Sequence, residues 1–127
     1  MSINSLVFIS YSHVDKDYVY NLTQEFDRIG LRYFLDEKDI NWGAKIKEKV
    51  QDALHSCIAV LVVISPASLK SAWVPFEIGH AMGTNKIVFP LLTHPSLDLP
   101  GYLNDLSYFV TPEKAIEYFK SQAWFNW

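Results

Sequence analysis

Hydrophobic residues along this chain alternate between short continuous runs and sets spaced three or four apart. The runs are rich in β-branched and aromatic residues, which is typical of strands buried on both faces. They lie at 6–12, 31–36, 57–65, 86–93 and, more briefly, 107–110. The spaced sets predict amphipathic helices at 15–30, 46–56, about 72–83 and 111–122. This alternation predicts an α/β fold in which helices cover both faces of a parallel sheet.

Right-handed crossovers between parallel strands would wind such a chain into a flavodoxin-like, doubly wound three-layer sandwich. We expect about five parallel strands in the order 2-1-3-4-5. The 127 residues suit a single domain, 1–127. In this architecture, ligands bind outside the carboxyl ends of the strands, so candidate site residues should follow the strands.

Capping and breaking residues set the expected ends of several elements. Asp15 can cap the first helix and Gly30 can end it. Pro75 fits only the first turn of a helix, which therefore starts near residues 72–74. Pro90 demotes the end of its strand to an edge or a bulge, and Thr111 can cap the closing helix.

Composition narrows the function classes. Half of the residues are hydrophobic and 15% are aromatic, so the chain can build a core. A net charge of −3 and only two arginines argue against nucleic acid as a partner. One cysteine excludes an internal disulfide, and the four histidines lack metal-ligand spacing, so no metal is expected. The apolar run 58–64 is too short to span a membrane and no signal peptide is visible, which predicts a cytoplasmic protein.

The stretch SAWVPFEIGHAM, residues 71–82, carries one carboxylate, Glu77, which is the only formal charge between Ser71 and Asn85. Trp73 lies four residues earlier, on the same face of the expected helix. An anion beside a flat aromatic suits a ligand that develops positive charge, such as a sugar losing its C1 substituent. The alternative is structural: an acid near the positive end of a helix dipole, with a tryptophan in the core.

Four segments resemble the TIR domain family in order and spacing. They are FISYS, the loop after LRYFLDEKDI, IAVLVVIS, and SAWVPFEI with its W-x-x-x-E pattern. The resemblance covers about Leu6 to Lys120. Within the family, the chain is similar to bacterial TIR proteins of anti-phage systems such as Thoeris. It implies cleavage of NAD⁺ at the nicotinamide–ribose bond, with NAD⁺ as substrate and no cofactor. The product would be ADP-ribose or a cyclic ADP-ribose isomer that signals to a separate effector.

The resemblance also implies residue roles. Glu77 would be the catalytic residue, and Trp73 would shape the pocket wall. The substrate-binding rim after the first strand would consist of Ser10, Tyr11, Ser12 and His13. The BB loop, Asp36 to Gly43, would close over the ligand or meet a second TIR domain; Asn41 would contact NAD⁺ and Trp42 could stack on a ring. Two features depart from the family: Ser12 and His13 stand where some members carry arginine or lysine, and NWG replaces a proline before the BB-loop glycine.

Two other interpretations remain beside the enzyme. Many TIR domains are non-enzymatic scaffolds that associate through TIR–TIR contacts, although scaffold members often lack the glutamate. A phosphorylated receiver domain is disfavoured, because the third strand ends in Ile64 and Ser65 where a receiver needs an aspartate. The residues leave open whether water or the adenine end of the same NAD⁺ molecule captures the ribose.

Overall fold

The structure, a computed structural model, describes residues 6–38, 44–103 and 106–121. In this part of the chain, the strands are β1 (Leu6–Ser12), β2 (Arg32–Lys38), β3 (Ala59–Ile64) and β4 (Ile87–Leu92). The helices are α1 (Lys16–Ile29), α2 (Ala44–Ser56), the short α3 (Pro66–Leu69), α4 (Trp73–Gly83) and α5 (Pro112–Ser121). Two 3₁₀ turns, η1 (His13–Asp15) and η2 (Gly101–Leu103), join them. The strands pair in parallel in the order β2-β1-β3-β4.

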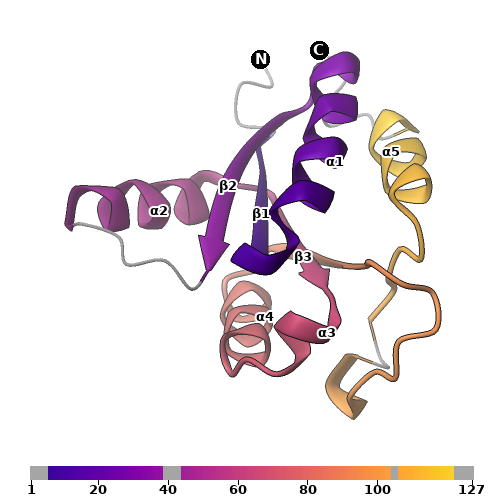
Figure 1. Ribbon diagram of the computed structural model, residues 1–127. Helices are drawn as coiled ribbons and strands as arrows, with labels where there is room; N and C mark the ends of the chain where they lie inside the picture. The colour runs from indigo at the N-terminus through magenta and orange to yellow at the C-terminus, as the bar shows by residue number, and fades with distance from the viewer. Residues whose placement is uncertain (1–5, 39–43, 104–105, 122–127) are drawn as a thin grey trace.

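Helices cover both faces of the sheet, which confirms the predicted three-layer α/β fold (Figure 1). One face packs on α1 and α5 through a cluster that includes Val19, Phe26 and Phe119. The other face packs on α2 and α4 through a cluster that includes Ala53 and Ile78. Strand β3 lies between β1 and β4, and all six of its residues are buried. This is why its sequence is continuously apolar, with no alternation.

The predicted fifth strand, 107–110, is reduced to a single parallel bridge between Leu91 and Phe109. Phe109 donates a backbone hydrogen bond to Pro90 O at 2.9 Å and accepts one from Leu92 N at 2.9 Å. The carbonyl of Pro90 therefore points away from β3, and so does its nitrogen, which has no hydrogen to give. Proline is tolerated here because its backbone nitrogen faces the outer side of β4, as expected for an edge strand. Because this nitrogen cannot donate a hydrogen bond, it also limits the pairing of β4 with the segment around Phe109.

Most of the expected helix ends are confirmed. Gly30 closes α1 in the left-handed conformation with φ 78°, and the Thr111 hydroxyl accepts from Lys114 N at 3.2 Å at the start of α5. The expectation that Asp15 caps α1 is wrong. Asp15 occupies the N-cap position without a capping bond, and its Oδ2 instead accepts a 2.5 Å hydrogen bond from Ser65 Oγ. The carboxylate thus joins η1 to the end of β3.

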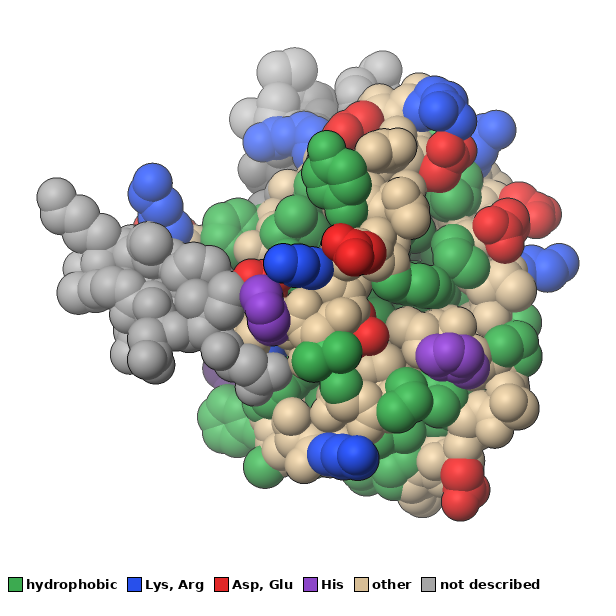
Figure 2. Space-filling model, in the orientation of Figure 1, with side chains coloured by type: hydrophobic (Ala, Val, Ile, Leu, Met, Phe, Trp, Pro, Cys, Tyr) green, Lys and Arg blue, Asp and Glu red, His purple; other side chains and the backbone are tan. Residues whose placement is uncertain are grey.

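Charge is mixed on the face of the molecule drawn in Figure 2. Among the described residues on the face drawn in Figure 2, acidic and basic side chains are interspersed with hydrophobic ones, and neither sign forms a broad patch. None of the described helices is both long and apolar enough to cross a membrane.

Candidate active site

The candidate site is built by the parallel register of β1 and β2. Ser10 pairs with Asp36 in this register, and Ser12 pairs with Lys38. Because side chains alternate across a sheet, Ser10, Asp36 and Lys38 all lie on the face covered by α2 and α4. They follow Phe8 and Phe34, whose rings stack on that same face at 5.7 Å between centroids.

Helix α4 brings the glutamate to these strands. Val74 and Ile78 anchor the helix in the core on the same face of the sheet. Glu77, one position before Ile78, is the fifth residue of the helix, beyond the first turn where the dipole and caps act. Its partners are side chains on the strands, so its carboxylate is not a helix cap. The purely structural alternative of an acid held by its own helix end therefore does not describe this residue.

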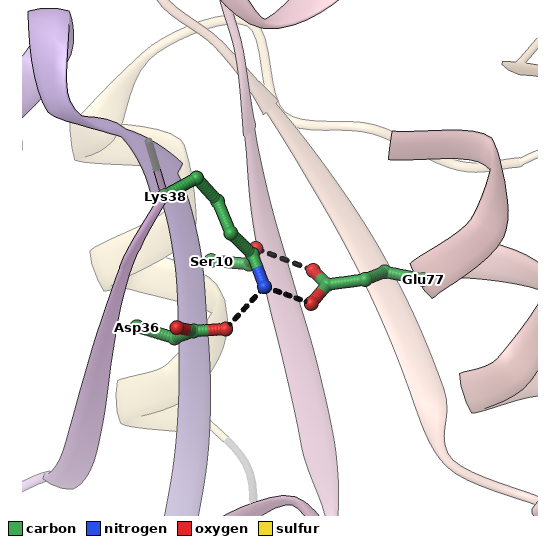
Figure 3. A network of polar contacts seen from close by, with 4 residues as sticks. All are labelled: Ser10, Asp36, Lys38 and Glu77. Carbon is green, nitrogen blue, oxygen red and sulfur yellow. Dashed lines mark hydrogen bonds and ion pairs between the residues drawn. The ribbon is translucent and has the colours of Figure 1, made fainter. Parts of the chain in front are cut away.

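Four polar side chains form one connected network (Figure 3). Ser10 Oγ donates a 2.5 Å hydrogen bond to Glu77 Oε1, and Lys38 Nζ donates to Glu77 Oε2. Lys38 Nζ also lies 2.5 Å from Asp36 Oδ2. Ser10 and Asp36 are buried, whereas the side chains of Lys38 and Glu77 retain 20% and 15% exposure. The network is thus open to a ligand on the side of Lys38 and Glu77 and closed beneath.

Two carboxylates face one ammonium in this network. Burial lowers the pKa of Lys38, but the charges and hydrogen bonds of Glu77 and Asp36 together outweigh it and raise this pKa above its ordinary value. Lys38 is therefore charged at neutral pH. With all three groups ionised, the network carries one net negative charge.

Trp73 borders the network as its spacing from Glu77 predicts. Its ring centroid lies 5.5 Å from Lys38 Nζ, within range of a cation–π contact. The ring is half-buried, and its Nε1 is a buried donor with no hydrogen-bond partner among the described residues.

A hollow of about 360 Å³ reaches Glu77 from between α2 and α4. Leu54 and Val60 give it apolar walls, and Phe76, which is 74% exposed, stands beside it. His80 contributes to its lining, so this histidine is a surface residue near the site. The volume falls within the range of small-molecule sites.

The residues expected to form the rim divide between the two sides of the sheet. Tyr11 is buried in the core cluster under α1 and α5, on the face opposite Glu77. Ser12 is buried and its hydroxyl accepts from Val14 N at 3.3 Å, which caps η1. His13 is exposed, with Nδ1 3.4 Å from Glu37 Oε2. Ser10 is the rim residue whose hydrogen bond to Glu77 builds the site.

Asn41 and Trp42 lie outside the described residues. Asp36, expected as the first residue of the BB loop, lies within β2 and is the buried partner of Lys38.

Lys38 is the site residue that sequence reasoning missed. The polar segment EKDINWGA suggested that the strand ends at Asp36, but β2 continues through Glu37 to Lys38. The alternation of two could have shown it, because a strand longer by two residues places Lys38 on the same face as Asp36.

The geometry can stabilise positive charge. A carboxylate held by a hydroxyl and an ammonium, beside an aromatic ring and an apolar hollow, can stabilise a cation that forms in a bound ligand. Among the described residues, no cluster of histidine, cysteine, aspartate and glutamate could hold a metal ion.

The chain aligns with curated relatives over about two thirds of its length. It is 27% identical over 89 residues to the 2′ cyclic ADP-D-ribose synthase BtTIR of Bacteroides thetaiotaomicron, covering 66% of this chain and 31% of the relative. It is 27% identical over 90 residues to the NAD(+) hydrolase TcpC of Escherichia coli O6:H1, covering 66% and 29%. The matched regions thus span about a third of these relatives.

Solved structures agree with the fold. The TIR domain of the Toll-related receptor TRR-2 from Hydra magnipapillata is similar with a TM-score of 0.67 and 26% identity, covering 87% of each chain. The family model described as TIR domain matches residues 7–122. With its strand order and its W-x-x-x-E helix at the sheet edge, the chain belongs to the TIR domain family.

Proposed function

We propose that this chain cleaves the bond between nicotinamide and ribose in NAD⁺, with Glu77 as the catalytic residue. The observation that carries the proposal is the placement of the Glu77 carboxylate. It lies at the carboxyl ends of β1 and β2, hydrogen-bonded by Ser10 and Lys38 and partly open to solvent. The names of the bacterial relatives, a cyclic ADP-ribose synthase and an NAD(+) hydrolase, support this substrate.

The proposed reaction starts with departure of nicotinamide. The bond from ribose C1′ to the ring nitrogen breaks, and its electron pair stays with nicotinamide, which leaves as a neutral molecule. The ribose becomes oxocarbenium-like, and the negative charge of Glu77 stabilises it. Nicotinamide is a good leaving group without protonation, so one carboxylate suffices and no general acid is needed.

Capture of the ribose completes the reaction. Attack by water gives ADP-ribose and releases one proton. Attack by a nucleophile at the adenine end of the same molecule gives a cyclic ADP-ribose isomer and also releases one proton. Cyclisation requires a site that folds the dinucleotide and excludes water.

The remaining roles follow the site geometry. Ser10 orients the carboxylate, and Trp73 forms the wall beside it. Ser12 ends β1 and His13 follows it. Both would contact the distal part of the ligand, where Asn41 and Trp42 are also proposed to act. Tyr11 lies across the sheet, so we assign it to the core and not to the ligand.

We further propose a signalling role for the product. A cyclic nucleotide can diffuse to a separate effector, and an anti-phage role in the cytoplasm would fit such a signal. Association between TIR domains would assemble the active form, so activity should depend on protein concentration.

A scaffold is the second candidate function, and exposed apolar side chains favour it. Phe76 and Met82 on α4 are 74% and 54% exposed, and the receptor TIR domain from Hydra shares the fold. A scaffold would associate through such residues and would not need an ionised Glu77.

The deciding experiment compares wild type with Glu77→Gln at high protein concentration. NAD⁺, nicotinamide and the second product are separated by chromatography and identified by mass. The matched control is Glu113→Gln, which changes an exposed glutamate in the first turn of α5. We expect the Glu77 variant to lose at least about a hundredfold in rate while the Glu113 variant keeps the wild-type rate. Equal rates for the wild type and the Glu77 variant, or no NAD⁺ consumption in concentrated assemblies, would contradict the proposal and favour the scaffold.

A further inference from the structure

The positive charge that contacts Glu77 comes from the chain itself. Lys38 Nζ contacts Glu77 Oε2, lies 2.5 Å from Asp36 Oδ2 and is 5.5 Å from the centroid of Trp73. Lys38 is the last residue of β2, so the strand fixes its backbone while its side chain reaches toward α4 (Figure 3). Three separate groups therefore hold one ammonium at one point.

The interaction acts in both directions. Glu77 and Asp36 raise the pKa of Lys38 despite the opposing effect of burial. In turn, the ammonium is the positive charge that balances the two carboxylates. Without it, the buried Asp36 and the nearby Glu77 would face each other with no cation between them.

We propose that Lys38 is a positioning residue for Glu77: its ammonium pairs with the carboxylate and keeps it turned toward the ends of β1 and β2, while Asp36 anchors Lys38 beneath. This role rests on the proposed NAD⁺ cleavage, because only that reaction needs an ionised Glu77. Stability alone gives a weak reason for the arrangement, since well-packed apolar residues often replace a buried ion pair at no cost.

The other titratable groups near Glu77 do not serve as the cation that pairs with its carboxylate. His80 follows one turn later on α4 and is exposed. His55 of α2 and Lys86 line the same hollow as Glu77. Lys86 Nζ donates to the carbonyls of His55 and Cys57, each at 2.7 Å, which holds it at the end of α2. Among the described residues, Lys38 is the cation in contact with Glu77.

The first test is the pH dependence of NAD⁺ cleavage in Lys38→Met and Lys38→Arg. Methionine keeps the length of the side chain and removes the charge, whereas arginine keeps the charge. For Lys38→Met we expect the acid limb of the kcat profile to move upward by about one pH unit or more. On that limb kcat falls about tenfold, KM stays within about threefold, and the loss shrinks as pH rises. Lys38→Arg should keep the wild-type profile.

A merely structural role for Lys38 predicts a different result. The loss in Lys38→Met would then be the same at every pH, or would appear in KM, and either outcome overturns the proposal. Because Asp36 is buried, Lys38→Met could also lose its fold. The double variant Asp36→Asn, Lys38→Met removes both charges and avoids that cost. Compared with Asp36→Asn alone, it should still show the upward shift of the acid limb; coincident profiles overturn the proposal.

The second test needs no activity. The titration of the Lys38 ammonium is followed by NMR of its labelled Cε carbon in wild type, Glu77→Gln and the control Glu113→Gln. We expect the midpoint to fall by about one pH unit in the Glu77 variant only. An unchanged midpoint overturns the proposal whether or not NAD⁺ is cleaved. A lowered midpoint in a protein that never cleaves NAD⁺ contradicts the proposed function and removes the catalytic role of Lys38, while the ion pair itself stands.

Discussion

Ser10 Oγ donates a 2.5 Å hydrogen bond to Glu77 Oε1 across 67 residues of sequence. The bond joins the end of β1 to the second turn of α4, and Ser10 is fully buried beneath it. A hydroxyl that donates to a carboxylate fixes its orientation and favours its charged form. The bond therefore ties the central part of the sheet directly to the proposed chemistry.

Ser10→Ala should lower the rate of NAD⁺ cleavage more than it lowers stability. Loss of a hydrogen bond to a charged group costs about 1.5–3 kcal/mol, which corresponds to a fall in kcat of about tenfold to a hundredfold. Steady-state kinetics and thermal unfolding are measured on the same samples. The control is Ser56→Ala, whose exposed hydroxyl donates to the backbone of its own helix, Asp52 O, at 2.8 Å. Equal activity in the two variants would show that Ser10 does not orient the carboxylate.

Ser65→Ala should destabilise the junction between η1 and β3. The buried Ser65 Oγ donates to Asp15 Oδ2 at 2.5 Å and accepts from Ser68 N at 3.1 Å, which begins α3. Alanine leaves both partners without this bond, at an expected cost of about 1–3 kcal/mol in the free energy of unfolding. Urea unfolding measures the change, and the exposed Ser56→Ala should cost less than about 0.5 kcal/mol. A loss at Ser65 no larger than at Ser56 would contradict this assignment.

Two glycines should respond to alanine in opposite directions. Gly30 has φ 78°, a conformation that costs an alanine about 1–2 kcal/mol, so Gly30→Ala should be destabilising. Gly79 is an exposed residue inside α4, and an added Cβ would meet nothing within 4 Å. Gly79→Ala should therefore stabilise by about 0.5–1 kcal/mol. In urea unfolding, the midpoint of Gly30→Ala should lie below that of the wild type and the midpoint of Gly79→Ala above it. Midpoints that move in the same direction in both variants would refute the prediction.

Local signals predicted the helix ends and part of the site. Gly30 ends α1 and Pro75 lies in the first turn of α4, because these residues restrict the backbone wherever they occur. The four-residue spacing of Trp73 and Glu77 likewise places both beside Lys38 in the structure. Each of these features depends on one element alone.

Features that depend on two or more elements were harder to predict. The contact of Lys38 with Glu77 depends on the length of β2 and on the packing of α4, 39 residues later. Aspartate is a residue type that often caps helices. At Asp15, however, the end of β3 brings Ser65 within reach, and the hydrogen bond with Ser65 replaces the expected capping bond to the backbone of α1. Tyr11 and Ser10 are adjacent in sequence, but their side chains lie on opposite faces of the sheet, so Tyr11 packs in the core while Ser10 contributes to the site.

That separation yields a prediction for Tyr11→Phe. Burial first, and then the charge and hydrogen bond of Glu37, raise the pKa of Tyr11 to about 12. The unfolded chain loses this proton near pH 10, so the folded state binds more protons between about pH 10 and about pH 12. The stabilisation from Tyr11 is thus complete below about pH 10 and is lost as pH rises through about 12.

Urea unfolding from about pH 8 to about pH 11 should show wild-type stability falling at the alkaline end and Tyr11→Phe falling less. Because the tyrosine lies on the α1 and α5 side of the sheet, the same variant should keep the wild-type KM and kcat for NAD⁺ at neutral pH. Ser10→Ala, one residue away, should show the opposite pattern: lower activity and an unchanged alkaline slope. A rise in KM for Tyr11→Phe would instead mean that the ligand reaches the residue, as the resemblance to the family implied.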